Sequence, residues 1–79
     1  MDKVIKRLFN AIKSGRFNYE NYLNGNNTYY GVNVLTQPLF CSYGQIGFET
    51  YVYDERRSHI ATIVRDWDLN KTYLENDDV

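Results

Sequence analysis

The residues of this chain that could perform covalent catalysis are few. A nucleophile with a general base would require Cys41 or a serine near His59, and Cys41 and His59 are the only cysteine and the only histidine in 79 residues. They fall in different predicted strands, and no third residue is placed to orient the histidine, as nucleophilic catalysis requires. We therefore expect a small buried thiol and a surface histidine, with no catalytic residue, no enzyme activity and no cofactor.

A run of acidic and amide side chains near the end of the sequence partly matches a metal site. Asp66, Asp68 and Asn70 occupy the first three side-chain positions of a calcium-binding loop, and Asp77 stands at position twelve. Lys71, however, stands where such a loop needs glycine, and aspartate replaces its bidentate glutamate. A lone cysteine also excludes the usual zinc spacing. We expect no metal, and interpret these carboxylates as ending a strand and turning the chain.

Tyrosine is the most over-represented residue type, with eight copies. Its ring offers a large rigid contact area and one hydroxyl, and tyrosine and arginine are both enriched at the energetic centres of protein interfaces. The predicted partner-binding residues lie on the non-core face of a strand and at the adjoining hairpin tip: Glu49, Tyr51, Tyr53, Arg56 and Arg57. The alternative is that the two tyrosines pack against cross-strand neighbours and stabilise the sheet.

Two further groups of residues are secondary candidates for binding. One is a tyrosine patch close to an Asn-rich turn, formed by Tyr19, Tyr22 and Tyr29. The other is the basic face of the first helix, which supports the alternative function of a nucleic-acid-binding regulator through Lys3, Lys6, Arg7 and Lys13. The net charge of −1 favours neither nucleic acid nor membrane as a partner, and a basic helix face is commonly just solvated.

The first element that must position these residues is an amphipathic helix over residues 3–14. Apolar residues recur at helical spacing and fall on one arc: Val4, Ile5, Leu8, Phe9, Ala11 and Ile12. Asp2 is expected to cap its start, and Gly15 stands where a glycine ends a helix. Asn18 is a candidate cap for a short helical turn that follows.

From Thr28 onward the pattern is typical of strands. One strand is expected to end at Pro38, residues 39–43 form a short edge strand, and residues 46–53 alternate between two faces. Residues 54–57 form a polar hairpin tip. Residues 58–66 fit both helical spacing and β-branched composition, and we favour a strand.

These elements predict an α+β fold, with the N-terminal helix packed on a small antiparallel sheet of three or four strands. Residues 1–79 form a single domain with a loosely ordered acidic tail at about 70–79. The predicted core comprises Val4, Leu8, Phe9, Ile12, Val32, Val34, Ile46, Phe48, Val52, Ile60 and Val64. We also expect Tyr30 to face the core.

The expected function is non-catalytic protein binding by a small inhibitor or adaptor that occludes a partner's surface. The size and the Asn/Lys/Ile/Tyr-rich composition resemble the small proteins of phages and mobile elements, which include anti-CRISPR and anti-restriction proteins. This resemblance carries over no residues. The lone cysteine, the lack of a signal-peptide pattern and the lack of a long apolar run predict an intracellular, cytoplasmic protein with a protein partner and no membrane association. The identity of the partner and the oligomeric state stay open.

Overall fold

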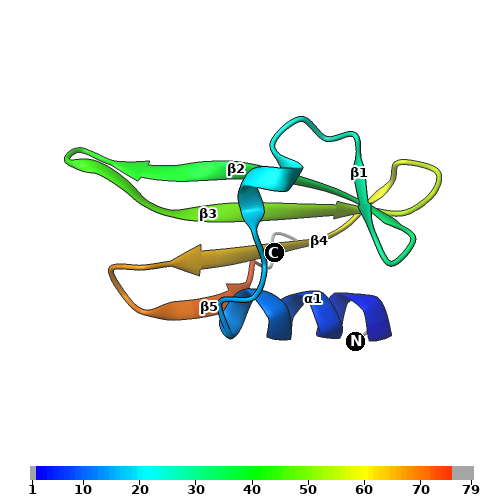
Figure 1. The fold of residues 1–79 in the computed structure, drawn as a ribbon, viewed down its shortest axis with the longest axis horizontal. Helices are drawn as coiled ribbons and strands as arrows, with labels where there is room; N and C mark the ends of the chain where they lie inside the picture. The colour runs from blue at the N-terminus through cyan, green and yellow to red at the C-terminus, as the bar shows by residue number, and fades with distance from the viewer. Residues whose placement is uncertain (1, 76–79) are drawn as a thin grey trace.

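One helix and a short 3-10 turn lie on one side of a five-stranded antiparallel sheet, in a computed structural model that describes residues 2–75 (Figure 1). The elements are α1 (Lys3–Lys13), η1 (Tyr19–Tyr22), β1 (Asn27–Tyr29), β2 (Val32–Cys41), β3 (Gly44–Tyr53), β4 (His59–Asp66) and β5 (Lys71–Leu74). The strands follow one another across the sheet in chain order. The predicted α+β class is confirmed, and the sheet has five strands rather than three or four. No helix within residues 2–75 is long and apolar enough to cross a membrane.

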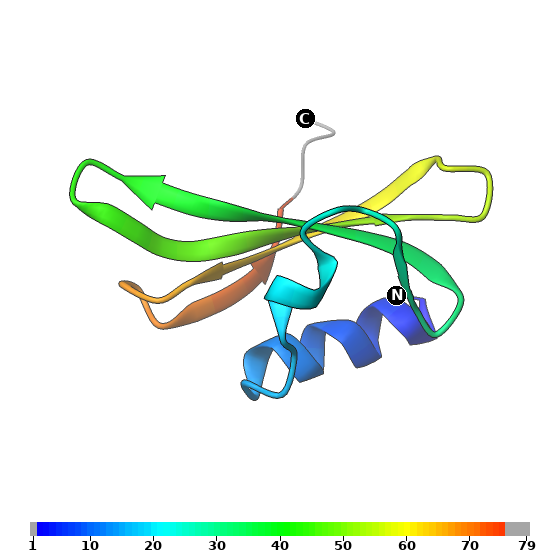
Figure 2. The same cartoon turned by 45° about the horizontal axis from the view of Figure 1, so that its top comes forward.

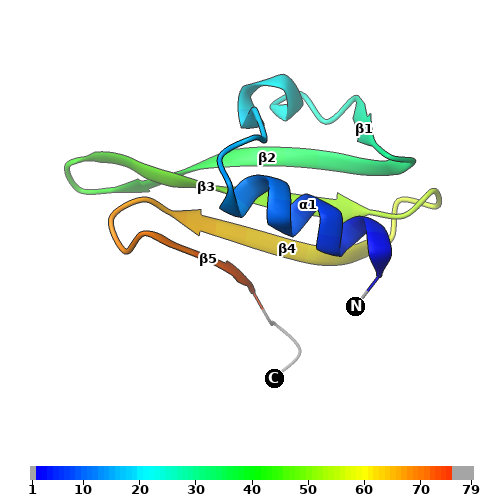
Figure 3. The same ribbon diagram turned by 60° about the horizontal axis from the view of Figure 1, so that its bottom comes forward.

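The first helix is delimited by the predicted caps. The Asp2 carboxylate accepts a hydrogen bond of 2.8 Å from the backbone N–H of Val4. Gly15 adopts φ +80°, and the following Arg16 N–H donates to the carbonyl of Ala11 across 2.9 Å, which satisfies a carbonyl that the helix leaves free. In Figure 3, α1 lies in front of the sheet, and the turns between β2 and β3 and between β4 and β5 extend past its end.

The two strands missed from the sequence are the short ones at the edges. β1 joins β2 through Tyr30 and Gly31, which have φ +47° and +90°, so both central residues of this two-residue turn are left-handed. Tyr30 is therefore 65% exposed and does not face the core as predicted. β5 lies within the segment predicted as a loosely ordered tail, of which residues 76–79 lie outside the described residues.

β2 continues through Pro38, where the sequence predicted that it would end. β1 pairs only with Val32–Val34, so the rest of β2 has a neighbour on one side only, which is β3. Proline is tolerated on an edge strand because no second neighbour needs its missing N–H. The predicted short strand at residues 39–43 is instead the end of β2 and its turn.

The hydrophobic core lies between α1 and the face of the sheet toward it, here called the inner face. Leu8, Val52 and Ile63 are fully buried there. Of the two β4 residues predicted to lie in the core, Val64 is buried, although it lies on the opposite side of its strand from Ile63. The prediction is wrong for Ile60, which is 41% exposed, at a bulge where it has no partner on β3. The buried core cluster consists of Ile5, Leu8, Ile12, Val34, Phe48, Val52 and Ile63.

Candidate functional site

Cys41 and His59, the pair considered for nucleophilic catalysis, lie at opposite ends of the sheet. Cys41 ends β2 beside Gly44, whereas His59 begins β4 opposite Tyr53. The ten residues of β3 separate these positions, which at about 3.3 Å per residue amounts to roughly 30 Å. The two side chains therefore do not form a nucleophile–base pair. Cys41 is half-buried rather than buried, and its thiol donates weakly to the Gly44 carbonyl at 3.5 Å.

Two aspartates of the partial calcium motif, Asp66 and Asp68, make contacts within the protein, and the third, Asp77, lies outside the described residues. The Asp66 carboxylate accepts a hydrogen bond of 3.0 Å from the N–H of Leu69, so it ends β4 and shapes the turn to β5. The Asp68 carboxylate accepts a hydrogen bond from the Tyr43 hydroxyl, which raises the pKa of that phenol. Within residues 2–75, no three His, Cys, Asp or Glu side chains gather closely enough to hold a metal ion.

The face of the sheet away from α1 is the principal candidate surface, here called the outer face. In Figure 2, α1 and η1 lie on the same side of the sheet, and no other described helix or strand covers the opposite side. Glu49, Tyr51 and Tyr53, three of the predicted residues, share this face because they alternate along β3. Their neighbours on β2 lie there too, since Tyr51 pairs with Leu35 and Glu49 pairs with Gln37. The outer face consists of Leu35, Gln37, Glu49, Tyr51, Tyr53, Thr62, Val64 and Tyr73.

The outer-face tyrosines pack against their neighbours and yet keep part of each ring exposed. The ring centroid of His59 lies 6.1 Å from that of Tyr51 and 5.7 Å from that of Tyr53. The Tyr51 hydroxyl donates to Glu49 at 3.2 Å, and a His59 ring nitrogen lies 2.6 Å from the Thr62 hydroxyl. Both tyrosines are only half-buried. Cross-strand packing thus holds these rings in place while leaving contact area available.

The surroundings of Tyr51 make stability sensitive to alkaline pH. Burial, followed by the nearby carboxylates of Glu49 and Glu75, raises the pKa of the Tyr51 phenol above its usual value near 10. Because the folded pKa exceeds the unfolded one, the resulting stabilisation is complete below about pH 10 and is lost as pH rises through the folded value. We expect Tyr51→Phe to lose less unfolding free energy than the wild type between about pH 8 and pH 11. Urea titrations at both pH values test this, and parallel losses would contradict it.

The predicted hairpin tip is formed by the β3–β4 turn. The Asp54 carboxylate accepts hydrogen bonds of 2.9 Å from the N–H groups of Arg56 and Ser58, and Arg57 adopts φ +66°. Both arginines are exposed. Arg57 also lines a pocket of about 380 Å³ together with Tyr53 and Leu35. The tip therefore adds two exposed guanidinium groups at the end of the outer face, beside the carboxylates of Asp54 and Glu55.

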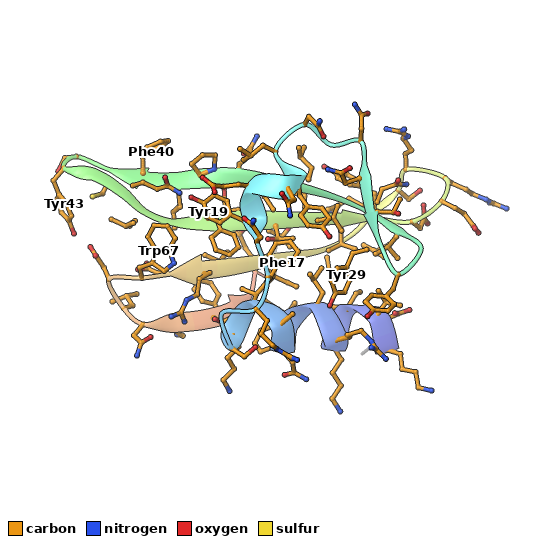
Figure 4. All side chains as sticks on the ribbon, in the orientation of Figure 1. Phe17, Tyr19, Tyr29, Phe40, Tyr43 and Trp67 are labelled. Carbon is orange, nitrogen blue, oxygen red and sulfur yellow. The ribbon has the colours of Figure 1, made fainter. Side chains whose placement is uncertain are left out.

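The secondary tyrosine patch lies on the inner side of the sheet, around Phe17. Tyr22 stacks on Phe17 with ring centroids 4.8 Å apart, Tyr29 meets Phe17 edge-on at 6.0 Å, and Tyr19 stacks on Phe48 at 4.4 Å. Figure 4 shows Phe17 and Tyr19 beside η1, with Tyr29 above α1. The patch does not join the outer face.

The basic residues of α1 are exposed along the helix. The guanidinium of Arg7 lies over the ring of Tyr30, 4.5 Å from its centroid. Lys13 lies in the last turn of the helix. The other two predicted nucleic-acid contacts, Lys3 and Lys6, project from its first turns.

Leu35 and Tyr73 are outer-face residues that were not predicted from the sequence. Leu35 could have been predicted, because successive strand residues face opposite sides of a sheet: Val34 faces the core, so Leu35 faces the outer side, as Asn33 does. The place of Tyr73 on the outer face depends on the pairing of β5 with β4, where Tyr73 lies opposite Val64. β5 has only four residues between polar segments, and so short a strand shows little periodicity in the sequence.

Comparisons of the chain with protein-family models, with curated protein sequences and with solved structures give no match.

Proposed function

We propose that this chain is a small non-catalytic protein-binding domain that acts as an inhibitor or adaptor by covering a surface of its partner. The observation that carries this proposal is the outer face, a sheet surface that bears Tyr51, Tyr53 and Tyr73 and that no other described element covers. Half-exposed tyrosines are characteristic of recognition surfaces, where they contribute contact area at low conformational cost.

The size of the outer face is sufficient for a specific complex. The molecule measures 37 × 27 × 25 Å along its principal axes. One face of it can therefore supply the roughly 800 Å² per partner that a standard interface buries. A smaller surface would support only a weak encounter.

The pocket beside Tyr53 is where we place the centre of binding. Its wall combines apolar surface from Leu35 with the charge of Arg57, so it suits an anchoring side chain of the partner that carries a carboxylate. Arg56 extends the same positive charge along the turn.

The composition shared with small phage and mobile-element proteins supports an anti-defence role, of the anti-CRISPR or anti-restriction type, for such an inhibitor. In that setting the partner is a protein of a host defence system. The domain would then need to block its partner only by occupying space, which requires no catalytic group.

We expect Tyr53→Ala and Arg57→Ala each to weaken partner binding by tenfold or more, about 1.4 kcal/mol, while costing less than about 1.5 kcal/mol of stability. Affinity capture from the native host identifies the partner, and calorimetric titration then measures each variant. Tyr30→Ala, a tyrosine on the inner side, is the matched control and should bind normally. Equal loss in all three variants, or in none, would contradict the assignment of the outer face.

A further inference from the structure

Two pockets on the inner side flank the segment that connects α1 to η1. The larger, here the Trp67 pocket, has a volume of about 540 Å³; the smaller, here the Tyr30 pocket, has about 340 Å³. Both volumes fall in the range of small-molecule sites, about 300–1,000 Å³. Arg16, Phe17 and Asn18 line both pockets, so the two are adjacent and share a wall.

Both pockets combine aromatic walls with cationic side chains. The Trp67 pocket has Tyr19, Phe48 and Trp67 with Lys13, Arg16 and Arg65. The Tyr30 pocket has Tyr22, Tyr29 and Tyr30 with Arg7 and Arg16. None of the described residues that line either pocket carries a carboxyl group. The C-terminal end of α1 also borders the Trp67 pocket, and its helix dipole places about half a negative elementary charge there. This partial charge is small beside the three cationic side chains. Both pockets therefore suit an anionic ligand.

Two of these arginines, Arg16 and Arg65, are positioned by hydrogen bonds to neutral groups of the described residues. Arg65 donates to the Thr72 hydroxyl at 3.1 Å and to the Asn70 side-chain oxygen at 2.9 Å. The Nε of Arg16 donates to the Ser14 hydroxyl at 2.9 Å. A guanidinium has five N–H donors, so each retains donors for a phosphate.

The aromatic rings form a connected series with exposed members at both ends. Phe17 lies between the pockets, with its ring centroid 4.8 Å from that of Tyr22 and 6.2 Å from that of Phe48. Trp67 is 43% exposed and Tyr30 is 65% exposed. Figure 4 shows Trp67 and Tyr29 on either side of Phe17. Rings at the two ends thus remain free to stack on a ligand.

We propose that this double pocket binds single-stranded nucleic acid, with bases against the aromatic walls and phosphates at Arg7, Arg16 and Arg65. Stacked aromatics beside cations are the general means by which proteins hold single strands. The repetition of this arrangement in two adjoining pockets favours a strand over a free nucleotide, which would occupy only one. An acidic peptide would satisfy the cations but not the rings. This site is separate from the outer face, so it does not depend on the proposed protein partner.

Trp67 provides the measurement, because it is the only tryptophan in the chain. We expect an oligothymidylate of about ten nucleotides, within the roughly 4–16 that single-strand-binding folds cover, to quench its fluorescence saturably at low salt. Thymidine monophosphate, a duplex of the same length and polyglutamate are titrated in parallel. Weaker binding of all three is expected. Equal binding of the duplex or of polyglutamate would overturn the role of the base pockets, and saturation by the mononucleotide at the same concentration would overturn the preference for a strand.

Variants separate the phosphate contacts from the stacking contacts. Arg16→Gln should weaken binding and reduce the slope of log affinity against log salt by about 0.7, the contribution of one phosphate contact in single strands. Tyr30→Ala should weaken binding about tenfold with the salt slope unchanged. Arg56→Gln, at the β3–β4 turn, is the matched control and should bind as the wild type does. The proposal would be overturned if the wild type bound the oligonucleotide and neither Arg16→Gln nor Tyr30→Ala weakened that binding. Absence of quenching at low salt would overturn it as well.

Discussion

Replacing Gly47 with alanine should destabilise the protein by about 3 kcal/mol or more, the upper range for overpacking a well-packed site. A Cβ at this position would lie 1.9 Å from the Arg65 carbonyl oxygen and 3.0 Å from the carbon of that carbonyl. Both are backbone atoms of β4, which cannot move aside as the end of a flexible side chain could. The added methyl group must therefore separate β3 from β4.

A bulge lies next to Gly47, in the pairing of β3 with β2, on the other side of β3 from the close approach to β4. The β2–β3 register passes from Leu39 opposite Gly47 to Phe40 opposite Gln45, which leaves Ile46 as an extra residue. The Trp67 N–H donates to the Ile46 carbonyl at 2.7 Å and holds the end of β4 against the bulge. A side chain at residue 47 would oppose that contact.

Thermal and urea unfolding followed by circular dichroism measure this effect. For a domain of this size the expected loss lowers the Tm by roughly 12–24 °C. Gly15→Ala is the control: no atom lies within 4 Å of the added Cβ, and only its φ of +80° opposes the change. That conformation costs about 1–2 kcal/mol. A Gly47→Ala protein within about 1 kcal/mol of the wild type would show that the strands yield easily, since about 1 kcal/mol is the average cost of a point substitution at any site.

The same substitution at two neighbouring threonines should have opposite effects on stability. Thr36 and Thr50 face each other across β2 and β3 on the inner face, and both are fully buried. The Thr36 hydroxyl donates to the Tyr19 carbonyl at 2.6 Å, whereas the Thr50 hydroxyl has no hydrogen-bond partner among residues 2–75. Valine preserves the β-branched shape at each position and removes only the hydroxyl.

Thr36→Val removes the hydrogen bond from the Thr36 hydroxyl to the Tyr19 carbonyl and should cost about 1 kcal/mol. Thr50→Val removes an unsatisfied buried group and should stabilise by about 1 kcal/mol. The two variants would then differ by roughly 2 kcal/mol in unfolding free energy. Urea denaturation of both proteins at neutral pH measures that difference. Equal destabilisation would mean that the Thr50 hydroxyl also forms a hydrogen bond in solution.

The parts of the fold that the sequence predicted correctly are those determined by local chemistry. Asp2 and Gly15 delimit α1 through contacts within a few residues. The β3–β4 hairpin follows from alternation along β3 and a polar turn. The candidate residues Glu49, Tyr51 and Tyr53 share a face for the same reason, since successive strand residues alternate between faces.

The parts that escaped prediction depend on pairing between distant segments. β1 and β5 have three and four residues, and they are strands because β2 and β4 offer open edges. The core residues of β4 could not be predicted because apolar residues occur on both of its faces, at Ile63 and at Val64, and because a bulge at Ile60 interrupts the alternation. The double pocket could not be predicted from local patterns either, since it forms only when the α1–η1 segment meets Phe48, Arg65 and Trp67 on one side and Tyr29 and Tyr30 on the other.

The unpaired stretch of β2 beyond β1 also bears on how the protein behaves at high concentration. An open edge of backbone donors and acceptors is a template on which another chain can add a strand and begin aggregation. Pro38 removes one donor in the middle of this stretch. The opposite edge is the four-residue β5, which begins with Lys71, and a short charged edge is a poor template. Pairing of a second chain with either edge of this sheet is thus disfavoured by backbone chemistry, so self-association would have to rely more on side-chain surfaces.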